Sequence, residues 1–159
     1  MIGFRKLFIL FLMVASSACF AASNYFEAIQ PVGDEGVLYI YRPKVKGVLI
    51  QPYRRSYPDL ILDGKSIDVL KFNTHRAVRI KAGEHTLRVT GLTKKANWEP
   101  RDKELTFKIV PGQIKYLKLN IQYGDRGGFD ERVIYITPIE PEDAIYEIRD
   151  TDEAEYHLK

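Results

Sequence analysis

The feature that most constrains the fold is a series of short segments in which apolar and polar residues alternate. Residues 76–81 place Ala77, Val78 and Ile80 among charged residues, and a period of two puts successive side chains on opposite faces of a β-strand. Glycine-containing turns separate these segments, as at 63–64, 82–84 and 111–113. On this basis we expect strands at 36–42, 60–62, 66–70, 76–81, 85–90, 104–110, 114–121 and 132–137.

Many short strands joined by tight turns predict an all-β fold, an antiparallel β-sandwich of about seven to nine strands. Residues 36–42 are almost all apolar or aromatic, which is typical of a central strand buried on both faces. Residues 123–130 read as a glycine-rich loop. Residues 141–149 predict one short C-terminal helix, because Pro141 suits a first helical position and acidic residues precede an apolar face.

The first residues predict export. Arg5 and Lys6 precede an apolar run, 7–14, that is too short to span a bilayer, and small residues follow it. We expect a signal peptide over 1–21, cleaved after Ala21, and a periplasmic protein. The alternative is a loose lipobox at 16–19, in which case Cys19 becomes the lipidated first residue of a membrane-anchored lipoprotein.

The expected boundaries are then a lead-in over 22–35, a sandwich domain over 36–149 and a charged, frayed tail over 150–159. Cys19 is the only cysteine, so the mature domain has no intrachain disulfide and relies on core burial. Removing Arg5 and Lys6 with the leader lowers the formal net charge from +3 by two, to +1. This balance does not support nucleic-acid binding, and we find no second apolar run of membrane-spanning length.

Four motifs in order resemble the bacterial DUF2846 family. They are Tyr-Ile-Tyr-Arg-Pro at 39–43, Leu-Asp-Gly-Lys at 62–65, Ala-Gly-Glu-His at 82–85 and Pro-Gly-Gln-Ile-Lys-Tyr-Leu at 111–117. The resemblance spans about 36–144 at domain-scale length. It implies an exported or lipoprotein-like domain, similar to PEGA-type and transthyretin-like sandwich modules. The family has no established activity to transfer, and Lys115-Tyr116 stands where it often has two aromatic residues.

The sequence contains few groups arranged for catalysis or metal binding. The histidines, at positions 75, 85 and 157, form no metal-binding pair, so we expect neither a metal nor a cofactor. His85 follows a turn glycine, where its ring is expected to bond the hairpin backbone. Asp125 and Asp130 frame the glycine-rich loop and offer oxygens to Ca²⁺, but without the EF-hand spacing.

Asp63 and Asp68 flank a predicted hairpin and could face one another as an acid pair. Turn chemistry explains Asp63 equally well, because Asp-Gly suits a turn with positive φ. A hydrolase built on this pair is the least favoured reading, since no partnered nucleophile is present.

The remaining candidate site is a basic, aromatic patch formed by two loops. Its residues are Lys44, Lys46, Tyr53, Arg54, Arg55 and Tyr57 from the first loop and Trp98 from the second. Such a patch suits an envelope protein, an anionic glycan or a lipid headgroup, while the simpler reading is a solvated loop. We therefore expect a non-enzymatic interaction or accessory module of the cell envelope. The alternative is a carbohydrate- or lipid-binding domain, and the oligomeric state stays open.

Overall fold

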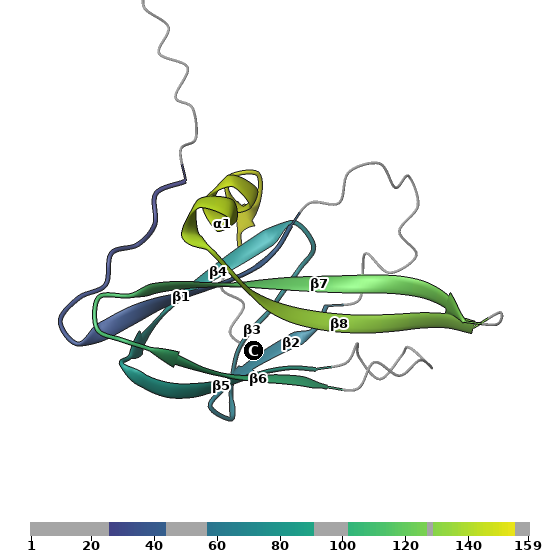
Figure 1. The fold of residues 1–159 in the computed structure, drawn as a ribbon, viewed down its shortest axis with the longest axis horizontal. Helices are drawn as coiled ribbons and strands as arrows, with labels where there is room; N and C mark the ends of the chain where they lie inside the picture. Colours follow the sequence, from purple (N-terminus) through teal and green to yellow (C-terminus); the bar gives the residue numbers. More distant parts are fainter. Residues whose placement is uncertain (1–25, 44–56, 91–101, 127–128, 155–159) are drawn as a thin grey trace, which may run out of the picture.

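The computed structural model describes residues 26–43, 57–90, 102–126 and 129–154, and in them two β-sheets lie face to face (Figure 1). A five-stranded sheet has the order β8-β7-β1-β4-β9, and a four-stranded sheet has the order β3-β2-β5-β6. These nine strands confirm the all-β sandwich. The strands are β1 (Glu35–Arg42), β2 (Asp59–Leu62), β3 (Lys65–Val69), β4 (Thr74–Lys81), β5 (Gly83–Val89), β6 (Lys103–Ile109), β7 (Ile114–Arg126), β8 (Phe129–Ile139) and β9 (Asp152–Glu153).

The pairing is antiparallel throughout the four-stranded sheet but mixed in the five-stranded one. β1 runs antiparallel to β4 and parallel to β7, and β9 runs parallel to β4. The expectation of a purely antiparallel sandwich is therefore incomplete. A parallel pair needs a long crossover, and the chain between β1 and β7 supplies one by building the whole four-stranded sheet and β4 on the way.

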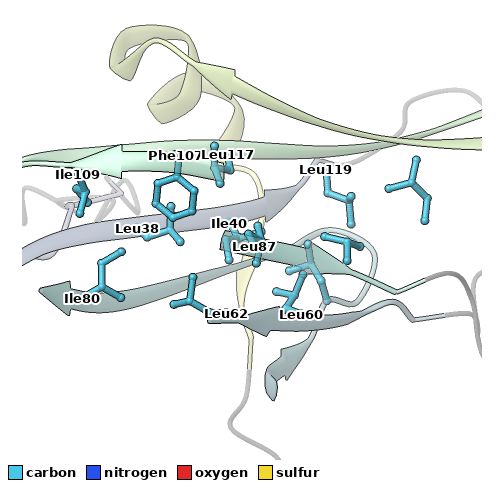
Figure 2. Close-up of a cluster of buried hydrophobic side chains, with 13 residues drawn as sticks. Leu38, Ile40, Leu60, Leu62, Ile80, Leu87, Phe107, Ile109, Leu117 and Leu119 are labelled. Carbon is cyan, nitrogen blue, oxygen red and sulfur yellow. The ribbon is translucent and has the colours of Figure 1, made fainter. Parts of the chain in front are cut away.

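The main core fills the space between the two sheets (Figure 2). β1 contributes Leu38 and Ile40, which meet Leu60, Leu87 and Phe107 of the opposite sheet. Each of these leucines is fully buried, and a side chain of this size contributes about 1.5–3 kcal/mol when it leaves water. Burial inside the sandwich follows the two-residue alternation that the sequence predicted.

A second apolar cluster covers the outer face of the five-stranded sheet. It contains Val37, Tyr39 and Tyr41 of β1, so this strand is buried on both faces, as predicted. Helix α1 (Pro141–Ile148) covers the cluster with Ala144 and Ile148, on the side away from the four-stranded sheet (Figure 1). The helix begins at its proline and carries acidic residues in its first turn, where they complement the positive end of the dipole.

The outer cluster is held by ring packing and by one polar contact to the helix. Tyr39 stacks on Tyr116 at 5.2 Å between ring centroids, and Phe26 of the lead-in meets the Tyr39 ring edge-on at 5.3 Å. Tyr41 donates a hydrogen bond of 2.8 Å from its hydroxyl to Glu147 Oε2. Lys118 Nζ lies 2.5 Å from the other carboxylate oxygen of Glu147, so strands β1 and β7 both anchor α1.

The predicted loop over 123–130 is wrong for its described residues, because β7 extends to Arg126 and β8 begins at Phe129. β7 and β8 stay in antiparallel register to Arg126 and Phe129, and Asp125 pairs with Asp130 across the ladder. The resulting hairpin extends beyond the other strands (Figure 1). The sequence signal that was overlooked is Gly127-Gly128, since paired glycines between two strands predict a two-residue hairpin connection.

The predicted frayed tail is also wrong as far as Ala154. β9 joins the edge of β4, where the Ala154 N–H donates to the carbonyl of His75 at 2.8 Å. The Arg76 side chain in turn donates to the carbonyl of Ala154 at 3.1 Å. The side chains of Asp152 and Glu153 stay exposed while their backbone pairs with β4. A charged composition therefore did not predict this strand.

Candidate binding groove

A groove with a volume of about 630 Å³ lies between the β2–β3 hairpin and β4. Its lining includes residues 76–80 of β4, residues 65–67 of β3, and the nearby side chains of Leu62, Asp63 and Ile29. A volume of this size lies within the range of ligand-binding clefts in proteins. The groove runs along the side of the sandwich, because β3 is an edge strand of its sheet and β4 lies next to the short edge strand β9.

Both strands that border the groove are incompletely paired within the described part of the chain. β9 pairs with β4 only at Thr74 and His75, and the described residues supply no strand beside residues 76–81 on that edge. β3 pairs with β2 and has no other described strand neighbour. The groove is therefore bordered by two sheet edges, which is the arrangement that receives an additional strand in other proteins.

A largely buried ion pair ties the two sides of the groove together. Arg76 Nε of β4 lies 3.5 Å from Asp68 Oδ2 of β3, and the two side chains are 14% and 6% exposed. Asp68 Oδ1 also accepts from the neighbouring Val69 N–H at 2.6 Å. This bridge fixes the spacing between the two sheet edges at the end of the groove near β9.

Two further cations lie in the groove without a described acidic partner. Lys65 and Arg79 are both exposed, and none of the described ion pairs contains either of them. Among the hydrogen bonds of the described residues, Arg79 makes a long one of 3.5 Å to the carbonyl of Gln30. With Arg76 matched by Asp68, these two side chains give the groove a net positive charge that an acidic ligand would complement.

The far end of the groove is closed by a clamp of Asp63 and His85. His85 Nδ1 lies 2.7 Å from Asp63 Oδ2, and His85 Nε2 lies 2.8 Å from the carbonyl of Lys81. The Thr86 N–H donates to the other oxygen of Asp63 at 2.9 Å. Because an ionised carboxylate and a carbonyl only accept hydrogen bonds, both ring nitrogens donate and the geometry suits the imidazolium form.

The electrostatics of the clamp favour the charged pair. Partial burial lowers the pKa of His85, but the hydrogen bonds to Asp63 and to the Lys81 carbonyl outweigh it and hold the pKa above the ordinary 6.5. Partial burial raises the pKa of Asp63, but the bonds from His85 and the Thr86 N–H outweigh it and hold the pKa below 3.8. With both ring nitrogens engaged, His85 has no nitrogen left to act as a general base.

The expected hydrogen bond from His85 to the hairpin backbone is confirmed, and its partner Asp63 was missed. Asp63 and Asp68 do not form the acid pair considered from the sequence. Asp63 bonds His85, whereas Asp68 lies opposite Leu60 in the hairpin and pairs with Arg76. The two carboxylates diverge because Asp63 belongs to the turn after β2, while the hairpin register turns Asp68 toward β4.

Most of the predicted basic, aromatic patch lies outside the described residues. This holds for Lys44, Lys46, Tyr53, Arg54, Arg55 and Trp98, and also for Cys19. Tyr57 is described: it is half-buried just before β2 and does not line the groove. Of the groove residues, Asp63 was singled out from the sequence but neither cation was, because Lys65 and Arg79 are ordinary exposed strand residues until the two sheet edges come together.

Within the described ranges, no group of three or more metal-ligating side chains gathers at one place. The calcium suggestion rested on a loop at 123–130, whereas Asp125 and Asp130 lie in strands β7 and β8. In the same ranges, no helix has the length and apolar character needed to cross a bilayer.

The fold and the groove define a class, a two-sheet β-sandwich with a groove along an incompletely paired edge of its described strands. Neither a family model nor a curated protein matches the chain.

Proposed function

We propose that this protein is an exported, non-enzymatic interaction module of the bacterial cell envelope that binds a partner through the β3–β4 groove. The observation that carries the proposal is the groove itself, with two incompletely paired sheet edges and the cations Lys65 and Arg79 at its surface. Export rests on the leader, and the resemblance to the DUF2846 family agrees with an envelope address.

Three features support binding rather than catalysis as the role of the groove. Both ring nitrogens of His85 are occupied, by Asp63 and by the Lys81 carbonyl, and Asp68 is matched by Arg76. The rest of the lining consists of aliphatic side chains, such as Leu62 and Val78, with a few cations and one hydroxyl, that of Ser66. A cleft with apolar walls and a few placed charges is typical of a binding site.

Site-specific photo-crosslinking in the source bacterium tests the groove. A photoreactive residue at Ser66, which lines the groove, should capture an envelope partner, whereas one at the exposed Lys108 of β6 should not. The double variant Lys65→Glu, Arg79→Glu should abolish the Ser66 adduct because it reverses the charge of the surface. Equal adducts from both positions, or an adduct unaffected by the charge reversal, would rule the groove out.

Mass spectrometry of the mature N-terminus tests the address. A chain starting at Ala22 indicates a released protein, and a lipid on Cys19 indicates an anchored one; both support export. Recovery of the uncleaved, full-length chain from the cytosol would contradict the envelope assignment.

A further inference from the structure

We infer that the groove binds an extended, acidic peptide segment of a partner protein, which adds to the five-stranded sheet as a new strand beside β4. The inference rests on the proposed function and names the class of its partner. It depends on backbone groups of β4 that face the groove, on apolar surface between the two edges, and on the charges at its rim.

The register of the sheet shows which backbone groups of β4 point outward. The Val37 N–H donates to the carbonyl of Gln113, so Val37 directs its backbone groups toward β7. Alternation then directs those of Leu38, and of its partner Val78 on β4, toward each other across the β1–β4 ladder. The odd-numbered residues of β4 consequently point their N–H and C=O groups away from β1, to the open edge.

At the two ends of this edge, outward carbonyl groups of β4 already accept hydrogen bonds. The carbonyl of His75 accepts from the Ala154 N–H, and the carbonyl of Lys81 accepts from the His85 ring. Between them, Ala77 and Arg79 have no described hydrogen bond to their outward backbone groups. β9 therefore occupies the first part of the edge and the His85 clamp ends it, leaving a stretch that matches one short added strand.

The surroundings of this stretch specify the side chains of the incoming strand. One wall is apolar, with Ile67, Val78 and Ile80, and the rim carries the exposed cations Lys65 and Arg79. Because side chains of a strand alternate between two faces, the matching segment has apolar residues on one face and carboxylates on the other. Opposite charge at the rim also speeds association and makes binding weaken as salt increases.

The probe is a short fluorescent peptide of alternating Val and Glu, capped at both ends, added to the full mature chain. Fluorescence anisotropy should show saturable binding that weakens with salt, and a peptide of alternating Val and Lys should not bind. Methylation of the probe's edge-facing amide nitrogens keeps its side chains but removes the pairing donors. We expect methylation to weaken binding about tenfold or more, because a few backbone hydrogen bonds between the probe and β4 are lost.

Protein variants repeat the test from the other side. Ala77→Pro removes an outward N–H and leaves the ladder with β1 intact, so it should weaken binding by about tenfold or more. Ala77→Ser retains the N–H and should bind like the wild type. Lys65→Glu with Arg79→Glu should abolish binding of the Val-Glu peptide. If Ala77→Pro does not fold, the methylated peptide decides the question alone.

Each remaining outcome counts against the inference. Equal binding of the methylated and parent peptides would exclude strand addition. The proposed function would survive that result if the photoreactive residue at Ser66 still captured a partner. Binding only by a chain shortened to end at Ala154 would assign the edge to the chain's own residues 155–159. A concentration-dependent dimer displaced by the peptide would assign it to a second copy. If neither the full mature chain nor the chain shortened to Ala154 binds the Val-Glu peptide, the inference is also overturned.

Discussion

Gly36 of β1 lies so close to Ile109 of β6 that no side chain fits between them. A Cβ atom at position 36 would be 2.6 Å from Ile109 Cδ1 and 2.9 Å from the carbonyl oxygen of Gln113. The close approach lets the β6–β7 turn reach β1, where the Gly112 N–H donates to the carbonyl of Glu35 at 3.0 Å. This position therefore joins the two sheets at the start of the central strand.

Gly36→Ala should destabilise the fold by about 1–3 kcal/mol, the usual cost of overpacking a core. The new methyl group has to displace both an isoleucine side chain and a backbone carbonyl. Urea unfolding followed by circular dichroism measures the change.

The matched control is the double variant Gly36→Ala, Ile109→Ala. Removing the isoleucine atoms that the new methyl meets makes the double loss smaller than the sum of the two single losses. Additive losses would show that Ile109 is not the side chain that limits position 36.

Tyr41→Phe should weaken the docking of α1 by about 1–2 kcal/mol, because Glu147 loses a hydrogen bond to its carboxylate. Burial and then the adjacent Glu147 carboxylate raise the pKa of Tyr41, so the hydroxyl remains a donor at any physiological pH. Amide hydrogen exchange should accelerate in α1 before the rest of the protein. Tyr146→Phe, at an exposed position of the same helix, should leave exchange unchanged; equal effects of the two variants would contradict the anchor.

Asp68→Asn should cost about 3–5 kcal/mol, because the largely buried Arg76 guanidinium loses the charge of the Asp68 carboxylate. Replacing both residues, as in Asp68→Leu with Arg76→Met, should cost less than Asp68→Asn alone, since no unmatched charge remains. Thermal unfolding of the single and double variants tests this ranking. A single variant as stable as the wild type would mean that the pair does not hold β3 against β4.

The Asp63–His85 clamp should make stability depend on pH within a defined window. The raised pKa of His85 gives a contribution that is complete below the unfolded value of 6.5 and lost as pH rises through the folded value. The lowered pKa of Asp63 gives a second contribution to stability, which is present above the unfolded value of 3.8 and lost as pH falls through the folded value. The clamp therefore stabilises most between about pH 4 and pH 6.5.

Comparison of wild type with His85→Gln over this range isolates the clamp. The difference should be about 1 kcal/mol or less, because Asp63 is half exposed and solvent screens the pair. The wild-type curve alone is not diagnostic, since burial lowers the pKa of His75 and that residue favours stability at higher pH. A stability difference that does not change between pH 5 and pH 9 would show that the pair is not charged.

Most of the sandwich could be predicted because the apolar and polar residues along each strand indicate which side chains are buried. The β1 segment is apolar or aromatic at every position from Val37 to Tyr41, and the structure buries it between the main core and α1. Turn positions were equally readable: Asp63 and Gly64 both adopt positive φ, as the Asp-Gly signal requires. The end of β7 was missed because the glycines and charged residues near Gly124 break the apolar–polar alternation. The strand there is defined by its backbone pairing with β8.

The candidate groove could not be predicted because it depends on pairing between distant segments. Ala77 and Arg79 have outward backbone groups only because β1 takes the other edge of β4 and β9 stops after His75. No local pattern encodes which edge of a strand stays open. The partnership of Asp63 and His85 likewise required the β2–β5 pairing, which brings two separate turns together.

The parallel pairing of β1 with β7 has a consequence for the order in which the chain folds as it is made. β1 is made early, yet the strand that pairs with one of its edges is made only after both strands of the β5–β6 hairpin. Pairing that joins distant parts of a chain is slow to form, since a large loop must close first. A chain still on the ribosome therefore holds β1 without its β7 neighbour until most of the described strands have been made.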